Sequence, residues 1–134
     1  MKKILLLLVL FATIRFPVFA NSKINVIKVY DGDSILAQID DNIFRIRLID
    51  IDCFEGTASS RAKWQAKKYK LSLDEIVQGG NIAGQILKEK LKNKEVFFEF
   101  KGIDKYNRAL GILYADYKNI NSEMLKTNYC KTFK

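Results

Sequence analysis

The sequence predicts a small α+β domain that is mainly β: a five-stranded barrel of the OB type with a helix inserted between its third and fourth strands. Five short segments are rich in β-branched and aromatic residues. The long stretch between the third and the fourth of them carries helix signals. A length of 134 residues, 49% of them hydrophobic, suits one globular domain. These features exclude a two-domain enzyme and a disordered or fibrous chain.

The first three strands are expected to form a meander, because only turn residues separate them. Asp31-Gly32-Asp33 follows the first strand and Asp40-Asp41-Asn42 follows the second. Arg45 and Arg47 lie two residues apart in the third strand and therefore share one of its faces. The expected strands are Ile24–Tyr30, Ser34–Ile39, Ile43–Ile51, Val96–Phe100 and Ala109–Tyr114.

The segment that follows the third strand combines a loop with a short helix. Gly56–Lys70 is polar and basic, and we interpret it as a loop with room for a short helical turn. Ser72 and Glu75 have the spacing of a capping box, which predicts a short helix that stops at Gly79-Gly80.

A longer amphipathic helix is expected over Asn81–Lys92. Its apolar stripe, which we assign to the core, consists of Ile82, Ile86, Leu87 and Leu91. After the fifth strand and a turn at Ala115–Asn119, Asn121 is expected to cap a final short helix that carries Met124 and Leu125.

Residues 1–20 are expected to be a signal peptide rather than part of the fold. A basic start, an apolar run from Ile4 to Ala12 and a small residue at Ala20 fit a secretory signal cleaved after Ala20. Arg15 and Pro17 interrupt the run, which makes it shorter than the roughly 20 residues of a membrane-spanning helix. We therefore expect a secreted or periplasmic protein whose domain is residues 21–134; an uncleaved anchor is the alternative.

Charge and composition narrow the chemistry. The chain has 23 Lys and Arg against 15 Asp and Glu, and cleavage after Ala20 would lower its formal net charge from +8 to +5. A basic balance favours an anionic partner such as nucleic acid, although a solvated lysine-rich surface explains it almost as well. The absence of histidine excludes histidine bases, histidine metal ligands and Ser-His-Asp triads. Two cysteines cannot supply a four-ligand zinc site.

Carboxylates concentrate at the ends of neighbouring strands. The acidic residues are Asp31, Asp33, Asp50, Asp52 and Glu55. Carboxylates that approach each other repel unless a cation compensates them, and hard oxygen ligands select Mg²⁺ or Ca²⁺. Taken alone, Asp31-Gly32-Asp33 has a simpler interpretation as an ordinary turn in which the glycine supplies a positive φ.

Arginines accompany these acids. Arg45 and Arg47 lie in a strand that is otherwise apolar, and Arg108 lies directly before the fifth strand. A guanidinium in such a position needs a charged partner, and two guanidiniums from separate strands can grip a phosphate. The alternative is that they are edge-strand charges that prevent aggregation.

Four blocks, in this order, resemble the successive motifs of the staphylococcal nuclease (thermonuclease) family. The blocks are Val29–Ile35, Arg47–Glu55, Asp104–Gly111 and Ile120–Leu125, so the resemblance covers about residues 24–130. It implies an OB-fold barrel and the Ca²⁺-dependent hydrolysis of phosphodiester bonds in DNA and RNA, by a monomer with no protein partner.

The resemblance also implies a role for each matching residue. Its metal ligands are the side chains of Asp33 and Asp52 and the main-chain carbonyl of Cys53. Glu55 matches the general base, and Arg47 and Arg108 match the phosphate-binding arginines. Lys105 and Tyr106 match residues that line the nucleotide pocket. A non-catalytic or truncated OB module that only binds nucleic acid remains an alternative, as does a basic surface protein directed at a membrane or polysaccharide.

The sequence departs from the family pattern at three places, one of which is a nucleotide-stacking tyrosine that would fall at or past Lys134. Phe54 stands where the family has a proline, so the fixed φ of proline is lost and a looser loop is expected around Glu55. The C-terminal helix of the family is expected to be missing, because the sequence runs only to Lys134. Cys53 and Cys130 form either a disulfide or two buried free thiols, and the sequence leaves both alternatives open.

Overall fold

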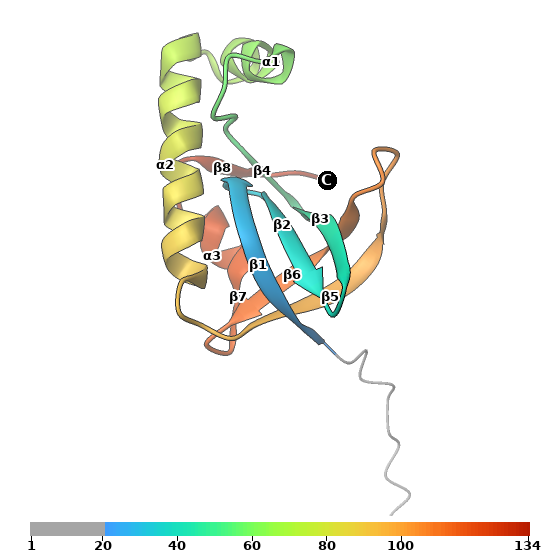
Figure 1. The fold of residues 1–134 in the computed structure, drawn as a ribbon. Helices are drawn as coiled ribbons and strands as arrows, with labels where there is room; N and C mark the ends of the chain where they lie inside the picture. Colours follow the sequence, from blue (N-terminus) through green and yellow to red (C-terminus); the bar gives the residue numbers. More distant parts are fainter. Residues whose placement is uncertain (1–20) are drawn as a thin grey trace, which may run out of the picture.

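The computed structural model describes residues 21–134, which form a closed five-stranded barrel flanked by helices (Figure 1). The barrel strands are β1 (Ser22–Asp31), β2 (Ser34–Ile39), β3 (Asn42–Leu48), β5 (Val96–Ile103) and β6 (Ala109–Ala115). The antiparallel neighbours run β3-β2-β1-β5-β6, and parallel pairing of β3 with β6 closes the ring. The predicted OB-type barrel with helices inserted between its third and fourth strands is confirmed.

The third expected strand, Ile43–Ile51, is too long. β3 ends at Leu48, and a turn with Asp50 at φ 64° leads into a separate strand, β4 (Ile51–Cys53). β4 leaves the barrel and pairs with β8 (Cys130–Thr132) near the end of the chain. Cys53 faces Cys130 in this ladder and forms a disulfide with it, so the free-thiol alternative is wrong.

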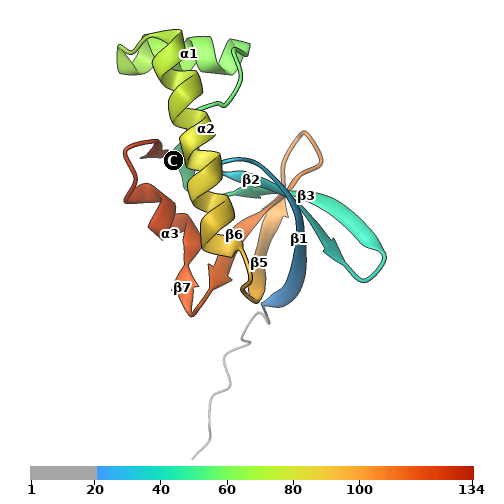
Figure 2. The same cartoon turned by 60° about the vertical axis from the view of Figure 1, so that its left-hand side comes forward.

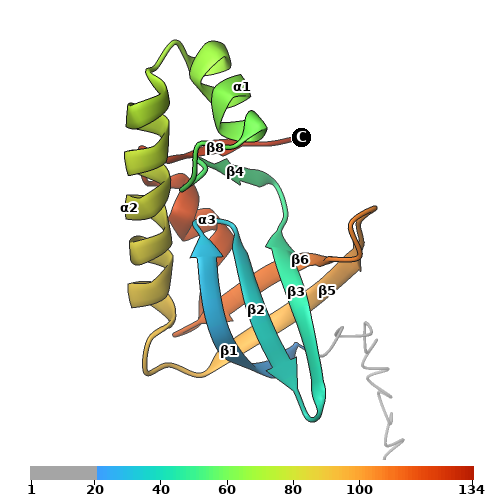
Figure 3. The ribbon, with the colours of Figure 1, turned by 45° about the horizontal axis from the view of Figure 1, so that its top comes forward.

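Aliphatic side chains from the strands fill the barrel and meet helix α2 (Leu73–Leu91). Ile35, Ile46 and Leu113 are fully buried, as is Leu87 of α2. The helix runs along one side of the barrel, with β1, β2 and β3 beside one another (Figure 3). The buried side of α2 therefore packs against the barrel and completes its core.

The expected break at Gly79-Gly80 is wrong, because α2 is one continuous helix that passes through both glycines. The predicted capping box does begin it: the backbone N–H of Glu75 donates to the Ser72 hydroxyl at 3.1 Å, and that of Ser72 donates to the Glu75 carboxylate at 2.7 Å. The glycines serve packing instead. A Cβ at Gly79 would lie 2.7 Å from the Phe54 ring, and one at Gly80 would overlap the backbone of Glu55.

The expected apolar stripe of this helix is partly wrong. Leu87 and Leu91 are buried as predicted, but Ile82 is 43% exposed and Ile86 is only partly buried. Ile76 and Ala83 complete the buried face. The small Ala83 was missed because it carries little hydrophobic signal.

Most of Gly56–Lys70, interpreted from sequence as a loop with room for a short helical turn, is helix α1 (Ser60–Tyr69), which lies across one end of α2 (Figure 2). Ser59 caps it by accepting the N–H of Ala62. Its buried side consists of Ala62 and Gln65, which is too little apolar surface to give a helical pattern in the sequence.

The last helix, α3 (Ile120–Leu125), follows the two-residue strand β7 (Lys118–Asn119). Asn119, not Asn121, is its N-cap and accepts the N–H of Ser122 at 3.0 Å. Asn121 is buried instead and bonds the backbone of Leu113 and Gly111. It thereby ties the start of α3 to the barrel wall.

In the part of the chain that the structure describes, no helix has the length and apolar character needed to cross a membrane. The predicted signal peptide, residues 1–20, lies outside that part and stays a prediction.

Candidate active site

A cleft of about 790 Å³ opens where the β1–β2 turn, the β3–β4 connection and the β5–β6 loop meet the C-terminal strand. Seven of the eight site residues predicted from sequence line it: Asp33, Arg47, Asp52, Glu55, Lys105, Tyr106 and Arg108. The eighth, Cys53, is buried behind the cleft wall. Segments that lie far apart in the sequence thus bring their acids and arginines to one place.

Two carboxylates lie deep in the wall. Asp33 is 5% exposed and Asp52 is 2% exposed. The Asp33 carboxylate accepts the backbone N–H of Cys53 at 2.7 Å, which ties the β1–β2 turn to β4. Asp31 holds the turn from the other side, since its carboxylate accepts the N–H of Asp33 at 3.1 Å and the hydroxyl of Ser34 at 2.8 Å.

Gly32 is needed in this turn for close packing. The interpretation that it supplies a positive φ is wrong, because Gly102 alone among the described glycines has one. A Cβ at Gly32 would lie 2.8 Å from that of Ala83 and 2.9 Å from the Cys53 sulfur. The acidic turn therefore packs directly on α2 and on the disulfide.

Arg47 lies between the two buried acids. Its Nη1 is 3.5 Å from Asp33 Oδ2, and its Nη2 is 3.6 Å from Asp52 Oδ1. Nη1 also donates to the Leu48 carbonyl at 2.6 Å. Arg47 thus has the charged partners that its position in the strand requires. Arg45 is exposed and stacks 4.5 Å from the centre of the Tyr30 ring.

Two side chains of α1 that were not among the predicted site residues, Arg61 and Gln65, also contact this acid cluster. Arg61 Nη2 lies 3.0 Å from Asp52 Oδ1 and lines the cleft. Gln65 is fully buried: its Nε2 donates to the Cys53 carbonyl at 2.9 Å and approaches Asp52 Oδ2 at 3.3 Å. Its Oε1 accepts the N–H of Glu55 at 2.9 Å. The sequence carries no signal for them, because the bounds of the short helix in this segment could not be predicted.

Gln65 and Phe54 explain how the loop around Glu55 is held without a proline. Phe54 is 5% exposed and packs against Tyr69 with the ring centres 5.8 Å apart. Its backbone N–H donates to the Tyr129 carbonyl at 2.8 Å. These contacts fix Phe54, and the hydrogen bond from the Glu55 N–H to Gln65 fixes Glu55. The loop is therefore held on both sides of the Phe54–Glu55 peptide bond without a proline.

Burial and like charge shift two of the carboxyl groups. Burial raises the pKa of Asp33 well above its usual value, and Asp31 raises it further, whereas Arg47 acts in the opposite direction. Burial also raises the pKa of Glu55, helped by Asp31 and Asp52 and opposed by Arg61 and Arg47. Arg47 and Arg61 therefore offset burial and repulsion only in part, and carboxylates this close together favour a bound cation.

The β5–β6 loop forms the opposite rim. Asp104 Oδ1 accepts the backbone N–H groups of Tyr106 and Arg108, each at 2.9 Å, and Arg108 Nε lies 2.7 Å from Asp104 Oδ2. Tyr106 is 67% exposed, with the Arg108 guanidinium 5.5 Å from its ring centre. The loop thus holds Arg108 by its Nε, and a guanidinium offers two further nitrogens to a ligand.

Within residues 21–134, no three Asp, Glu or Cys side chains come together closely enough to hold a metal ion by themselves. Asp33 and Asp52 are the deepest carboxylates of the cleft, and the Cys53 carbonyl, which accepts from Gln65, keeps a second lone pair. A cation here would need those oxygens together with water or substrate oxygens.

The profile of the family described as "Staphylococcal nuclease homologue" matches residues 45–134. This chain belongs to that family. The match begins within β3 and includes β4, α1 and the β5–β6 rim of the cleft, so the predicted family is confirmed.

Proteins similar to this staphylococcal nuclease homologue include two with nuclease names. An "Uncharacterized endonuclease" of Haemophilus influenzae is 28% identical over 136 aligned positions, which cover 99% of this chain and 66% of that protein. A "Micrococcal nuclease" of Shigella flexneri is 26% identical over 115 positions, covering 86% and 55%. An uncharacterized protein of Methanocaldococcus jannaschii is 26% identical over 130 positions, covering 81% and 58%. The chain spans about half to two thirds of the length of these relatives.

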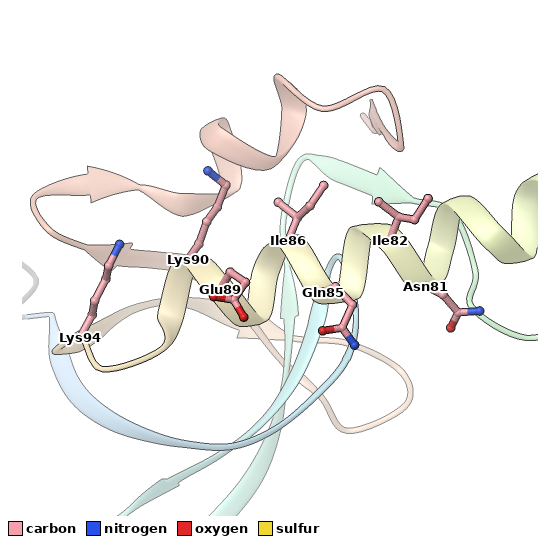
Figure 4. Close-up of a pocket in the computed structure, with 7 residues that line it drawn as sticks. All are labelled: Asn81, Ile82, Gln85, Ile86, Glu89, Lys90 and Lys94. Atoms are coloured by element: carbon pink, nitrogen blue, oxygen red, sulfur yellow. The ribbon is translucent and has the colours of Figure 1, made fainter.

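A second hollow of about 790 Å³ lies along α2 (Figure 4). Its lining consists of Asn81, Ile82, Gln85, Ile86, Glu89, Lys90 and Lys94. This lining has one carboxylate and no arginine, so it lacks the paired acids and guanidiniums of the cleft. The cleft, and not this hollow, is therefore the candidate active site.

Proposed function

We propose that this protein is an exported Ca²⁺-dependent nuclease that hydrolyses phosphodiester bonds of DNA and RNA. One observation carries the proposal: Arg47 lies between two buried carboxylates in a cleft that Glu55 and Arg108 also line. The family membership and the nuclease names of two relatives support it.

The residues present suit Ca²⁺ in donor chemistry. Carboxylate and carbonyl oxygens are the ligands that this ion prefers, and burial together with the nearby Asp31 raises the pKa of Asp33, as expected where buried carboxyl groups lie close together. Asp33, Asp52 and the Cys53 carbonyl would hold the ion, which when bound polarises a phosphoryl oxygen.

The remaining chemistry belongs to side chains of this chain. Glu55 takes a proton from a water molecule placed for in-line attack on phosphorus, and its raised pKa brings it closer to neutral pH, where a general base works best. Arg47 and Arg108 stabilise the negative charge that builds on the phosphoryl oxygens. Removing either guanidinium should lower the rate by about 10²- to 10³-fold.

The rim residues define where the substrate enters. Lys105 and Tyr106 are exposed beside Arg108, and an ammonium next to an aromatic ring suits a nucleotide. Such contacts involve phosphate, sugar and the face of a base, so we expect little base preference. Export through the predicted signal peptide would place the enzyme in the periplasm or outside the cell, acting as a monomer.

Incubation of the purified protein with plasmid and single-stranded DNA and with RNA, in Ca²⁺ or in chelator, tests the proposal. We expect degradation in Ca²⁺, none in chelator, and a large loss of rate in Glu55→Gln. Intact substrate in both conditions would reject it.

A second candidate, a non-catalytic module that binds nucleic acid, is favoured by one observation. Asp33 and Asp52 both have an arginine nitrogen within 3.6 Å, so the arginines already compensate part of the negative charge that a cation would neutralise. This candidate predicts salt-dependent binding without cleavage and no effect of Glu55→Gln.

A further inference from the structure

Helix α1 and the last strand carry an exposed surface that is both basic and aromatic, next to the cleft. We call it the α1 surface; its members are Arg61, Lys63, Trp64, Lys68, Lys131 and Phe133. Trp64 is 42% exposed and Phe133 is 44% exposed. Ser60–Tyr69 contains no acidic residue, so no carboxylate of α1 itself offsets these cations.

Cations and rings alternate on this surface. The Arg61 guanidinium lies 4.4 Å from the centre of the Trp64 ring and 5.7 Å from that of Phe133. Lys68 follows Trp64 in the sequence, and its Nζ lies 4.6 Å from the centre of the same ring. Arg61, Trp64 and Lys68 are spaced three and four residues apart, so they form one stripe of the helix.

The stripe begins inside the cleft. Arg61 and Phe133 both line it, and Arg61 also pairs with Asp52 at 3.0 Å. From Arg61 to Lys68 the helix advances about 10 Å, the length of roughly three stacked nucleotides. A nucleic-acid strand that leaves the cleft past Arg61 would therefore contact Trp64 and Lys68.

We propose that the α1 surface binds the single-stranded nucleic-acid segment that flanks the phosphodiester in the cleft. Bases stack on aromatic rings and on guanidinium planes, and lysines neutralise the phosphates between them. The inference deepens the proposed nuclease function and rests on it for the position of the phosphodiester. Packing does not account for the tryptophan, because Ala62 and Gln65 supply the buried side of α1.

The composition of the surface argues against an apolar protein partner. Covering Trp64 with such a partner would also bury Lys68, for which the partner would offer no counter-charge, and that is costly. A polyanion supplies counter-charge and flat rings together.

Trp64 is the only tryptophan of the chain, so its fluorescence reports on the α1 surface directly. The protein is titrated in chelator, which prevents cleavage, with a single-stranded DNA of about ten nucleotides, its RNA counterpart, and a dinucleotide. We expect both long strands to quench the fluorescence in a salt-dependent way and the dinucleotide to leave it almost unchanged.

Substitutions then separate stacking from charge. Trp64→Ala should weaken binding of the long strands by about 5- to 100-fold in an anisotropy assay, whereas Trp64→Phe should retain most of the affinity. Lys68→Ala should reduce the salt dependence by about one phosphate contact. Tyr117→Ala and Lys88→Ala are matched controls: both residues are exposed, and Tyr117 lies in the β6–β7 turn, at the other end of the molecule from α1 (Figure 1).

The outcomes keep the two proposals apart. Quenching by long strands in a protein that hydrolyses none would retain the α1 surface and reject the nuclease. Hydrolysis with no quenching, and with unchanged affinity in Trp64→Ala, would retain the nuclease and overturn the α1 surface. A response to vesicles of anionic phosphatidylglycerol, but not to oligonucleotides, would also overturn it and assign the surface to a membrane.

Discussion

Breaking the Cys53–Cys130 disulfide should destabilise the protein strongly while leaving its chemistry in place. The bridge joins residues 77 positions apart. By restricting the unfolded chain, a bridge over such a loop stabilises the folded state by about 4.5 kcal/mol near room temperature. For a domain of this size that free energy is a fall in melting temperature of roughly 15–20 °C.

The native contacts around the bridge explain why activity should survive below the new melting point. The Phe54 N–H still donates to Tyr129, and the Phe133 N–H still donates to Asp50 at 3.0 Å, so β4 and β8 remain paired. Gln65 also holds the Cys53 carbonyl independently of the sulfur. The acids and arginines of the cleft should therefore keep their positions.

Urea unfolding of the oxidised and reduced protein, followed by circular dichroism, measures the loss. The control is the double variant Cys53→Ala/Cys130→Ala, which should match the reduced wild type and show no response to reductant. Equal unfolding free energies for oxidised and reduced wild type would refute the reasoning. Loss of cleavage at a temperature where the reduced protein is folded would show that the bridge also positions the site.

Three further perturbations test the cleft. Gly80→Ala should displace the Glu55 backbone and lower the cleavage rate more than substrate affinity, whereas Gly84→Ala, whose added Cβ meets Asp31 at 3.4 Å, should cleave normally in the same assay. Gln65→Leu leaves the N–H of Glu55 without its partner and should cost about 1–3 kcal/mol in urea unfolding; a wild-type value would contradict the positioning role. Because the pKa of Asp33 is raised, the native protein holds a proton that the unfolded chain releases first. In chelator, its stability should therefore fall as pH rises from the usual aspartate range through the raised pKa. In Asp33→Asn this fall should become smaller, leaving the part that the raised pKa of Glu55 contributes; a fall of the same size would contradict the assignment.

The barrel and the cleft were predictable because their signals are local. Strands such as Ser34–Ile39 alternate or are rich in β-branched residues, and turn residues mark their ends. The predicted site residues lie in short blocks at those ends, so once the strands pair as a barrel, Asp33 and Arg47 have little freedom to lie elsewhere.

The features that the sequence did not reveal depend on contacts between distant segments. Gly79 and Gly80 resemble a helix stop unless one knows that the Phe54–Glu55 peptide packs against them. Asn121 resembles an N-cap until the carbonyl of Gly111 is found next to its amide. The disulfide depends on the register of β4 against β8, which places Cys53 opposite Cys130. Neither strand carries a sequence pattern that indicates pairing with a segment 77 residues away.

The ion pairs of the cleft connect these observations to the proposed chemistry. Asp33 and Asp52 share the guanidinium of Arg47, at 3.5 and 3.6 Å, and each of these distances is longer than the 2.7–2.9 Å of a strong charged hydrogen bond. Because Arg47 divides its guanidinium between the two carboxylates, it pairs fully with neither of them. A cation that engaged the two carboxylates would weaken their hold on Arg47, which also lines the cleft, and would leave its guanidinium free to bind a phosphate. On the proposed function, metal binding and phosphate binding should therefore reinforce each other, since each removes a competitor of the other.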